Sequence, residues 1–268
     1  MKDKIMISLK IVTIILIVIA IAGIIYSAVK AKTEKVQNPV VTFEIENYGN
    51  IKMELYPEYA PNTVANFIKL VEAGYYNNKV IYSKDDICVY LGRNTDGTTE
   101  EPTLSKINSG IEAGTENDKK YQIAGEFVAN GFERNTLRHE KGIVTMIRSD
   151  YTSQMPTLAE QSYNSANSQI GIITSDDARD LNGVYAGFGR IIEGLDIVEK
   201  IASESQIEEK TEENASDMDV FVTKPVIKNA TVDTFGNDYG VPQTVEYFDY
   251  QAYMSEILSQ YYGTQGNE

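Results

Sequence analysis

Alternating apolar and polar residues near the start of the globular part constrain the fold most strongly. In residues 40–46 the apolar side chains Val41, Phe43 and Ile45 share one face, and residues 51–56 alternate in the same way. The residues between the two stretches, Asn-Tyr-Gly-Asn at 47–50, are typical of a turn. Because successive side chains of a strand point to opposite faces, this pattern predicts an antiparallel hairpin with one buried face.

Two stretches carry the period of an amphipathic helix instead. Behind Pro61, the residues Val64, Phe67, Ile68 and Val71 fall at i, i+3, i+4 and i+7, and a second short helix is predicted over 194–202. Further apolar runs predict strands at 87–91, 142–147, 169–174, 184–192 and 225–235. Many strands with only two helices among them favour a mainly β fold, a closed barrel, over a layered α/β fold.

The first 30 residues differ from the rest. Ile11 to Val29 is a run of 19 residues without a charge, and at ~1.5 Å per residue it nearly spans a ~30 Å hydrocarbon core. A cleaved signal peptide is the alternative, but its apolar region is usually shorter, roughly 7–15 residues, and Lys30 interrupts the place of a cleavage site. We therefore predict a cytoplasmic N-terminus at 1–10, a transmembrane anchor at 11–29 and a linker at 30–39. Lysines nearly balance on the two sides of the run.

Charge and residue usage exclude several functional classes. The chain has a formal net charge of −15, and without residues 1–30 the remainder holds 20 basic and 38 acidic residues. Such a surface argues against a nucleic-acid partner, which requires a basic patch. One cysteine, Cys88, allows no internal disulfide, and one histidine, His139, argues against a Cys/His zinc site and against Ser-His or Cys-His catalysis. We expect no metal and no cofactor.

Two segments stand apart from the predicted strands. Residues 93–120 are polar and rich in glycine, which predicts a long surface loop. Residues 236–268 form a C-terminal tail with a one-sided helix behind the N-cap candidate Asp249. Its apolar residues are Tyr250, Tyr253, Met254, Ile257, Leu258 and Tyr261. The helix packs either on its own barrel or on a partner protein.

Several segments along residues 40–235 resemble one known family. They are Gly49-Asn50-Ile51, Glu54-Leu55-Tyr56, the run 60–67, Gly74-Tyr75-Tyr76, Glu126-Phe127, His139-Glu140-Lys141-Gly142, Met146-Ile147-Arg148, the run 164–169, Leu181-Asn182-Gly183 and Phe188-Gly189-Arg190. In combination they resemble a bacterial cyclophilin-type peptidyl-prolyl cis-trans isomerase. The resemblance implies a closed eight-stranded antiparallel β-barrel with two capping helices, to which this chain adds the N-terminal transmembrane helix and the C-terminal helix. His139 matches a histidine that the family uses structurally.

The chemistry of that family makes a clear demand. Rotation about an X-Pro bond breaks amide resonance and has a barrier of ~18–20 kcal/mol, so a catalyst must bind the twisted bond better than either planar form. The resemblance implies three devices for this purpose. An apolar pocket holds the proline ring, a glutamine and nearby backbone hold the peptide carbonyls, and an arginine donates toward the proline nitrogen.

Most of these devices are altered in this chain. Tyr76 and Gly92 match family residues without a gap, which places the family's Phe-His-Arg segment on Ile81-Tyr82-Ser83. The arginine is then Ser83, or Tyr82 if the register slips by one residue. The other positions that the resemblance assigns to peptide binding are Cys88, Val89, Leu91, Ile147, Gln169, Gly171, Leu181 and Tyr185. Cys88 and Gly171 replace aromatic residues, so the proline pocket is expected to be wider and less aromatic.

Arg93 is the candidate replacement for the missing cation. It lies two residues after Leu91, and if the strand continues, that parity points both side chains to the same face. At ~3.3 Å per residue it would sit ~6–7 Å further along the strand. The alternative is that Arg93 is a solvated strand end.

Three interpretations of function follow. The first is a membrane-anchored peptidyl-prolyl isomerase and folding factor for exported proteins, with weak activity. The second is a catalytically inactive module that binds proline-containing segments or an envelope protein partner. The third is a structural domain of a larger envelope assembly. The first requires a cation near Ser83 and an aromatic pocket floor.

The predicted anchor makes the membrane topology testable. We expect residues 11–29 to stay in the membrane with the barrel outside the cytoplasm, because the apolar run is long and its N-terminal flank is basic. External protease should therefore digest the barrel in intact cells. Complete protection of the barrel while the envelope is intact would contradict this orientation.

Overall fold

The computed structural model describes residues 13, 15–24, 37–210 and 218–265. These residues fall into two units, 1–37 and 38–268, and the fold below is that of the second unit. Among the described residues, no helix combines the length and the apolar character needed to cross a membrane. Much of the predicted anchor at 11–29, and most of the linker at 30–39, lie outside the described residues.

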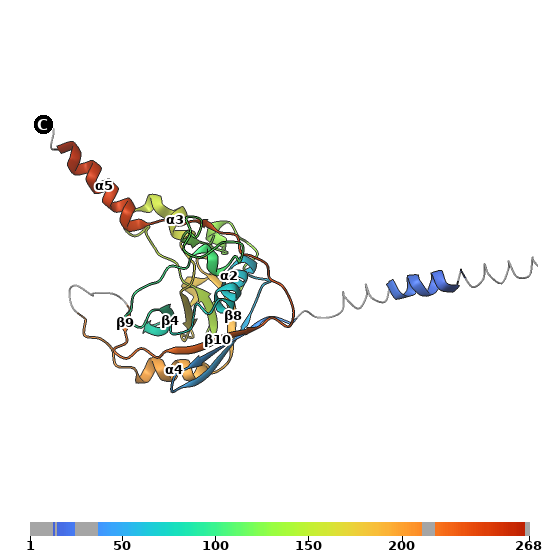
Figure 1. Ribbon diagram of the computed structural model, residues 1–268. Helices are drawn as coiled ribbons and strands as arrows, with labels where there is room; N and C mark the ends of the chain where they lie inside the picture. Colours follow the sequence, from blue (N-terminus) through green and yellow to red (C-terminus); the bar gives the residue numbers. More distant parts are fainter. Residues whose placement is uncertain (1–12, 14, 25–36, 211–217, 266–268) are drawn as a thin grey trace, which may run out of the picture. The chain divides into compact units, whose positions relative to one another are not determined.

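One curled antiparallel sheet of nine strands forms the body of the described domain (Figure 1). The strands follow the spatial order β10-β1-β2-β8-β6-β7-β4-β3-β9. Their bounds are β1 (Val40–Ile45), β2 (Gly49–Leu55), β3 (Val80–Lys84), β4 (Cys88–Arg93), β6 (Ile143–Met146), β7 (Ile170–Ile173), β8 (Ala186–Glu193), β9 (Asp219–Val220) and β10 (Ile227–Asp233). The predicted hairpin is confirmed as β1 and β2, in which Val40 pairs with Glu54 and Ile45 with Gly49.

The expected closed eight-stranded barrel is confirmed only as a mainly β, curled half-barrel. Between β3 and β10 the described residues show a single bridge, Val80 with Val226, in place of a regular ladder. Pro225 contributes to this irregularity, because it has no N–H to donate and only accepts a hydrogen bond from Ile81 N (2.9 Å). Further along the same edge, β3 pairs with β9 at Ser83 and Lys84, whereas its opposite edge pairs with β4.

Two helices that the apolar periodicity predicts pack against strands of the curled sheet. They are α2 (Pro61–Glu72) and α4 (Leu195–Glu204). Phe67 of α2 is fully buried at the centre of the core. Its ring centroid lies 5.1 Å from that of Tyr76, 5.1 Å from that of Phe188 and 6.2 Å from that of Phe43. Offset and edge-to-face ring contacts of this kind stabilise a core beyond the area they bury.

Several short elements were not predicted from the sequence. They are the helix α3 (Ala159–Tyr163), the 3-10 helices η1 (Leu104–Lys106), η2 (Val128–Asn130), η3 (Pro156–Leu158) and η4 (Arg179–Leu181), and a two-stranded sheet of β5 (Tyr121–Gln122) and β11 (Val245–Glu246). Elements of two to five residues carry too little periodicity to distinguish them from loops.

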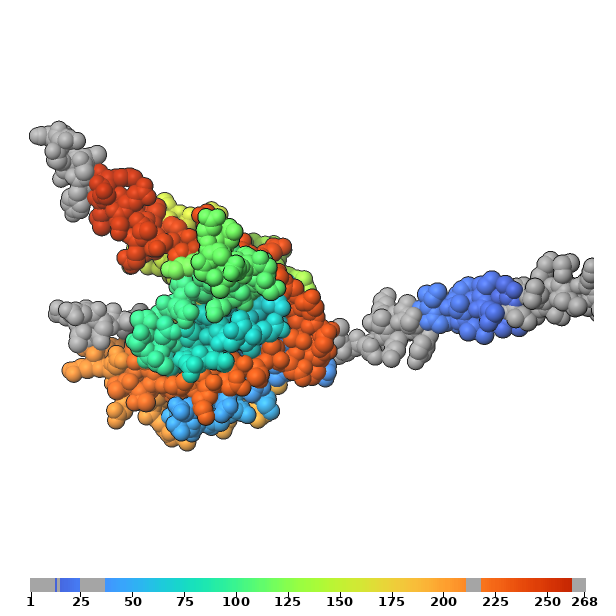
Figure 2. Space-filling model, viewed as in Figure 1, coloured from blue at the N-terminus to red at the C-terminus, as the bar shows by residue number. Residues whose placement is uncertain are grey.

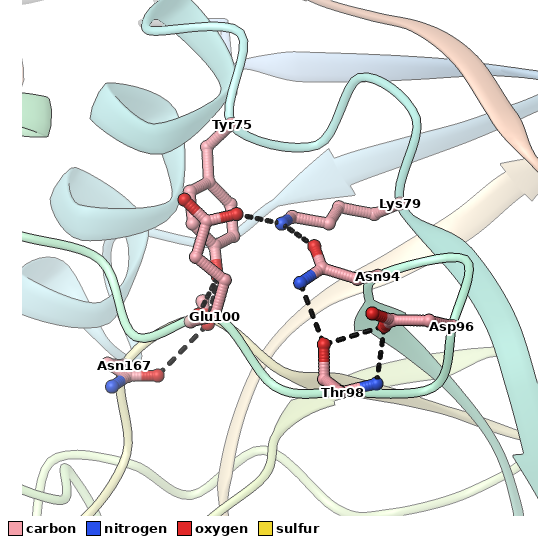
Figure 3. Close-up of polar contacts among 8 residues, drawn as sticks. Tyr75, Lys79, Asn94, Asp96, Thr98, Glu100 and Asn167 are labelled. Atoms are coloured by element: carbon pink, nitrogen blue, oxygen red, sulfur yellow. Dashed lines mark hydrogen bonds and ion pairs between the residues drawn. The ribbon is translucent and has the colours of Figure 1, made fainter.

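The long loop at 93–120 is tied to the core at its start (Figure 3). Lys79 is almost fully buried, and its ammonium group contacts the Glu100 carboxylate at 2.5 Å and Asn94 Oδ1 at 2.5 Å. Asn94 Nδ2 in turn donates to Thr98 Oγ1 at 3.1 Å. The Tyr75 hydroxyl donates to the Glu100 carbonyl. A buried ammonium requires such partners, and they fix where the loop leaves β4.

The C-terminal tail packs on the domain through its first part. Its strand β11 pairs with β5, and the predicted helix is confirmed as α5 (Tyr250–Gln265) with Asp249 as its N-cap, since Ala252 N donates to Asp249 Oδ1 at 3.0 Å. Beyond its first turns α5 projects from the domain (Figures 1 and 2). Leu258 and Tyr261 are 49% and 59% exposed. The domain itself therefore covers only the beginning of the predicted apolar stripe.

A buried carboxylate caps the N-terminus of α2. The N-cap residue Ala60 offers no side-chain cap. Glu126, in the segment after β5, takes over this role and accepts hydrogen bonds from Asn62 N (3.0 Å) and Thr63 N (2.7 Å). Asn135 fixes the backbone of this residue by donating to its carbonyl (2.9 Å). A negative charge at this end of a helix satisfies unpaired N–H groups and interacts favourably with the helix dipole.

Glu126→Gln should destabilise the domain. Glutamine preserves the shape but removes the charge and one of the two acceptors, which leaves a buried N–H unsatisfied. We expect the free energy of unfolding to fall by about 1–3 kcal/mol, measured by denaturant unfolding. The control is Glu72→Gln, at the exposed end of the same helix, which should change stability much less. Equal effects of both substitutions would contradict the capping role.

Candidate functional site

A cleft of about 240 Å³ lies beside β3, β4 and the segment before β7. Four tyrosines, two arginines and one acid are among the residues that line it. The lining residues are Tyr82, Tyr90, Arg93, Glu101, Gln122, Ile147, Arg148, Ser149, Tyr151, Ser165, Asn167, Gln169, Met218 and Tyr247. Three of the peptide-binding candidates named from the sequence, Tyr82, Ile147 and Gln169, are therefore brought together here.

Gln169 is the polar centre of this cleft. Its Oε1 accepts a hydrogen bond from the Tyr82 hydroxyl at 2.8 Å and one from Arg93 Nε at 3.3 Å. The Arg93 guanidinium also stacks on the Tyr82 ring, with Cζ 4.2 Å from the ring centroid. Burial raises the pKa of Tyr82, and the nearby Arg93 charge opposes this effect. A neutral phenol, a guanidinium and an amide thus meet at one point.

Two β-bulges in the β3–β4 ladder bring Tyr82 and Arg93 together at Gln169. Val80 pairs with Arg93 and Ile81 with Leu91, so Gly92 has no partner between them. Ile81 and Ser83 pair with successive residues of β4, so Tyr82 is the extra residue on β3. Gly92 has a φ of +116°, and a Cβ there would lie 3.3 Å from Gln169 Cα. The bulges redirect the side chains of Tyr82 and Arg93 toward Gln169.

The parity argument for Arg93 is wrong, although Arg93 does reach the cleft. Leu91 is fully buried in the core, whereas Arg93 is half-buried and lines the cleft. The two side chains do not share a face because the unpaired Gly92 between them breaks the alternation of the strand.

Ser83 is not among the residues that line the cleft. It is fully buried, pairs with Tyr90 and with Val220, and its Oγ contacts Met218 Sδ at 3.8 Å. Of the two positions that the resemblance offers for the family's arginine, Tyr82 is the one whose side chain reaches Gln169.

The apolar candidates on β4 lie elsewhere. Val89 and Leu91 are fully buried in the main core. Cys88 belongs to a second apolar cluster with Ile143 and Ile173, and burial raises the pKa of its thiol to about 12. The neighbouring Tyr90 lines the cleft instead, although the sequence comparison did not assign it. Alternation along β4 places Tyr90 opposite to Val89 and Leu91.

The loop before β4 orients Tyr90. Its hydroxyl donates to Asp85 Oδ2 at 2.5 Å, and Asp85 Oδ1 accepts from Ile87 N and Cys88 N at 2.8 and 2.7 Å. Burial and this carboxylate raise the pKa of Tyr90. The ring is therefore a fixed, neutral wall of the cleft.

The space at Gly171 is already occupied. A Cβ placed on Gly171 would lie 3.1 Å from Ile147 Cδ1, 3.4 Å from Cys88 Sγ and 3.4 Å from Thr145 Cγ2. The resemblance predicts a wider pocket at this position, but Ile147 packs into the available volume.

Arg148 lines the cleft and also contacts Tyr185, another of the peptide-binding candidates. Its Cζ lies 4.6 Å from the ring centroid of Tyr185 and 5.2 Å from that of Tyr163, and its Nε donates to Val184 O at 3.1 Å. Burial raises the pKa of Tyr185, and the Arg148 charge opposes it. Tyr185 and Leu181 are half-buried outside the cleft lining.

His139 supports the frame of the site, in agreement with its expected structural role. Its Nδ1 lies 3.3 Å from Asn182 Oδ1, and its Nε2 lies 3.1 Å from Thr145 Oγ1. Only 4% of the residue is exposed, and this burial lowers its pKa to about 4. The imidazole is neutral at physiological pH.

Comparisons with known proteins agree on one family. The family described as "Cyclophilin type peptidyl-prolyl cis-trans isomerase/CLD" matches residues 40–232. A probable peptidyl-prolyl cis-trans isomerase of Brucella suis is 31% identical over 163 residues, which cover 60% of this chain and 70% of the relative. A peptidyl-prolyl cis-trans isomerase-like 2 protein of Rhizopus delemar is 28% identical over 160 residues. That match spans only 24% of the fungal protein.

A solved structure shares the fold. It is a cyclophilin-type peptidyl-prolyl cis-trans isomerase of Cryptosporidium parvum, determined in the presence of the dipeptide Ala-Pro. The match has a TM-score of 0.52 and 19% sequence identity, and it covers 72% of this chain and 98% of that structure. The half-barrel with its covering helices is therefore a known architecture.

Protonation of His139 should make stability depend on pH. Its pKa in the folded state, about 4, lies below the ordinary value of 6.5. Between these two values only the unfolded state binds the proton, so stability falls as the pH falls from about 6.5 to 4, by about 3 kcal/mol in total. His139→Gln keeps polar groups but does not titrate here. Its melting temperature should fall less over this pH window than that of the unmodified protein. Identical pH profiles would contradict this contribution.

Proposed function

Because this chain belongs to the cyclophilin-type peptidyl-prolyl cis-trans isomerase family, we propose that it binds proline-containing peptide segments at Gln169 and isomerises X-Pro bonds slowly. The proposal rests mainly on one observation: the Arg93 guanidinium contacts both Gln169 and the ring of Tyr82. Arg93 supplies the cation that the altered residues at 82 and 83 no longer provide. The Ala-Pro dipeptide present with the Cryptosporidium parvum structure belongs to the same class of ligand.

The three side chains suit the two tasks of the reaction. Gln169 Oε1 already accepts two hydrogen bonds, so its amide N–H groups are the ones that can donate to a peptide carbonyl. Arg93 has further N–H groups that can donate toward the proline nitrogen as the bond twists and its lone pair localises. Such a contact is strongest in the twisted state and therefore accelerates the reaction.

The residues at the family's proline-binding positions explain why we propose a low rate of isomerisation. Cys88 and Gly171 offer no aromatic surface to a proline ring, and Ile147 fills the space beside Gly171. Weaker contacts with the ring reduce binding of ground and transition states alike. A cation that approaches from β4 rather than β3 also needs an altered peptide position, and each ~1.4 kcal/mol of lost transition-state stabilisation costs about tenfold in rate.

A catalytically inactive binding module is the second candidate. It is favoured by the composition of the cleft, whose lining includes Tyr82, Tyr90 and Tyr151 but excludes Cys88 and Gly171. A cleft of this kind offers aromatic and polar contacts to an extended segment without a specific seat for proline. Proline-containing segments or an envelope protein partner would then be held without isomerisation.

The cellular setting belongs to the same proposal. The apolar run 11–29 supports a membrane anchor, with the domain on the extracytoplasmic side and exported proteins as its clients. The strong negative charge of the remaining chain is compatible with a domain that stands free of anionic lipid.

Arg93→Ala should lower isomerase activity. Removing a charged hydrogen-bond donor costs roughly 1.5–3 kcal/mol, so kcat/KM of the full-length chain on a proline peptide should fall about tenfold or more. Arg93→Lys should retain part of the activity, because lysine keeps the charge but not the planar fork. The measurement is NMR exchange spectroscopy between the cis and trans peptide signals.

The matched control is Arg134→Ala, since Arg134 is exposed and outside the cleft. It should leave kcat/KM unchanged. Unaltered activity in Arg93→Ala would remove Arg93 from the mechanism. Peptide binding by the unmodified chain without any exchange would replace the isomerase with the binding module.

A further inference from the structure

The segment Gln243–Tyr250, here called the tail strap, returns from β10 to the cleft. Asn62 at the start of α2 holds its first residue by two hydrogen bonds, donating from Nδ2 to Gln243 O (2.9 Å) and accepting from Gln243 N (2.7 Å). Strand β11 then pairs Val245 with Gln122 and Glu246 with Tyr121. Hydrogen bonds to the backbone of the strap thus attach it to two separate parts of the domain, α2 and β5.

Aromatic contacts fix the far end of the tail strap. The rings of Tyr151 and Tyr250 stack with centroids 4.7 Å apart and an interplanar angle of 7°. Phe248 contacts the Tyr151 ring at 5.5 Å, and its N–H donates to Gln122 Oε1 at 3.0 Å. The Tyr250 hydroxyl donates to Gln154 Oε1 at 2.6 Å. Because Tyr151 and Gln122 also line the cleft, the strap and the cleft share side chains.

Tyr247 is the strap residue that enters the cleft lining. It is half-buried, and burial, with the nearby carboxylates of Glu101 and Asp249, raises the pKa of its phenol to about 12. Lys120 Nζ lies 5.3 Å from its ring centroid. Tyr247 thus adds a neutral ring to a cleft that already contains Arg93.

The size and lining of the cleft define what it can accept. Its volume of about 240 Å³ is below the roughly 300–1,000 Å³ of pockets that hold whole small ligands. A single side chain fits this space. Aromatic rings and two guanidinium groups, Arg93 and Arg148, line it, and both kinds of group make favourable contacts with the face of an aromatic ring.

We infer that Tyr247 of the tail strap is a specificity-determining residue that selects, for this cleft, an aromatic side chain next to the proline of the bound segment. This inference rests on the proposed function, since it requires a peptide at Gln169. It adds a part of the chain outside the family match at residues 40–232 to the binding site.

Binding of a reference peptide and of a matched set of phenylalanine peptides tests the inference. One short peptide has alanine at every position except proline, and the others carry a single phenylalanine one or two residues before or after the proline. Dissociation constants are measured by fluorescence anisotropy with the full-length chain and with Tyr247→Ala, Tyr247→Phe and Tyr253→Ala. Tyr253 is the control because it contacts Phe248 on the same tail but is outside the cleft lining.

The unmodified chain should bind its best phenylalanine peptide at least fivefold more tightly than the alanine peptide. Tyr247→Ala should reduce this ratio to below twofold with little change for the alanine peptide, whereas Tyr247→Phe and Tyr253→Ala should preserve it. A preserved ratio in Tyr247→Ala, or no preference in the unmodified chain, overturns the inference and leaves the proposed function intact. Absence of binding by every peptide overturns both.

A second measurement needs no variant. A peptide with benzoylphenylalanine at the preferred position is photo-crosslinked to the unmodified chain, and the product is mapped by mass spectrometry. Attachment within 243–250 or to the facing residues Tyr151 and Gln122 is expected. Attachment confined to other surfaces would contradict the inference, even if Tyr247→Ala does not fold.

Discussion

The backbone of the segment before β7 is held by buried side chains, and the rest of the site depends on these contacts. Tyr76 donates from its hydroxyl to Ser168 O at 2.7 Å, and Asn66 of α2 donates from Nδ2 to Asn167 O at 2.5 Å. All four residues are buried, so each of these groups would be costly to leave unpaired. They place Gln169, the next residue, in the lining of the cleft. The hydrogen bonds that satisfy these buried groups therefore also fix the position of Gln169.

The same contacts link the cleft to the loop that follows β4. Tyr75, next to Tyr76, contacts Ser168 Oγ at 3.1 Å and donates to the Glu100 carbonyl, while the Glu100 carboxylate pairs with Lys79. A change in the core around α2 would consequently be transmitted to Glu101, the next residue, which lines the cleft. The charged pair itself is half exposed on the Glu100 side, so its main value is positional.

Local periodicity predicts the frame of this domain from sequence, but not the orientation of its site residues. The hairpin of β1 and β2 and the stripe of α2 depend on neighbours a few residues apart, and the structure confirms them. The register around Tyr82 and Gly92 depends on two bulges, each of which reverses the alternation on which the sequence argument rests. The sequence therefore leaves both Ser83 and Tyr82 open for the arginine position, and in the structure it is Tyr82 that reaches Gln169. Pairing of β5 with β11 joins residues more than 120 positions apart, and two-residue strands give no local signal.

The position of β11 near the end of the chain has a consequence during synthesis. The half-barrel is complete in sequence at Asp233, whereas the pairing residues Val245 and Glu246 follow later. At about 5–20 residues per second, the strap is synthesised roughly half a second to three seconds after the last barrel strand. A nascent domain can therefore assemble its core with the cleft still open on the side of β5. The order of translation therefore completes this cleft after the half-barrel itself.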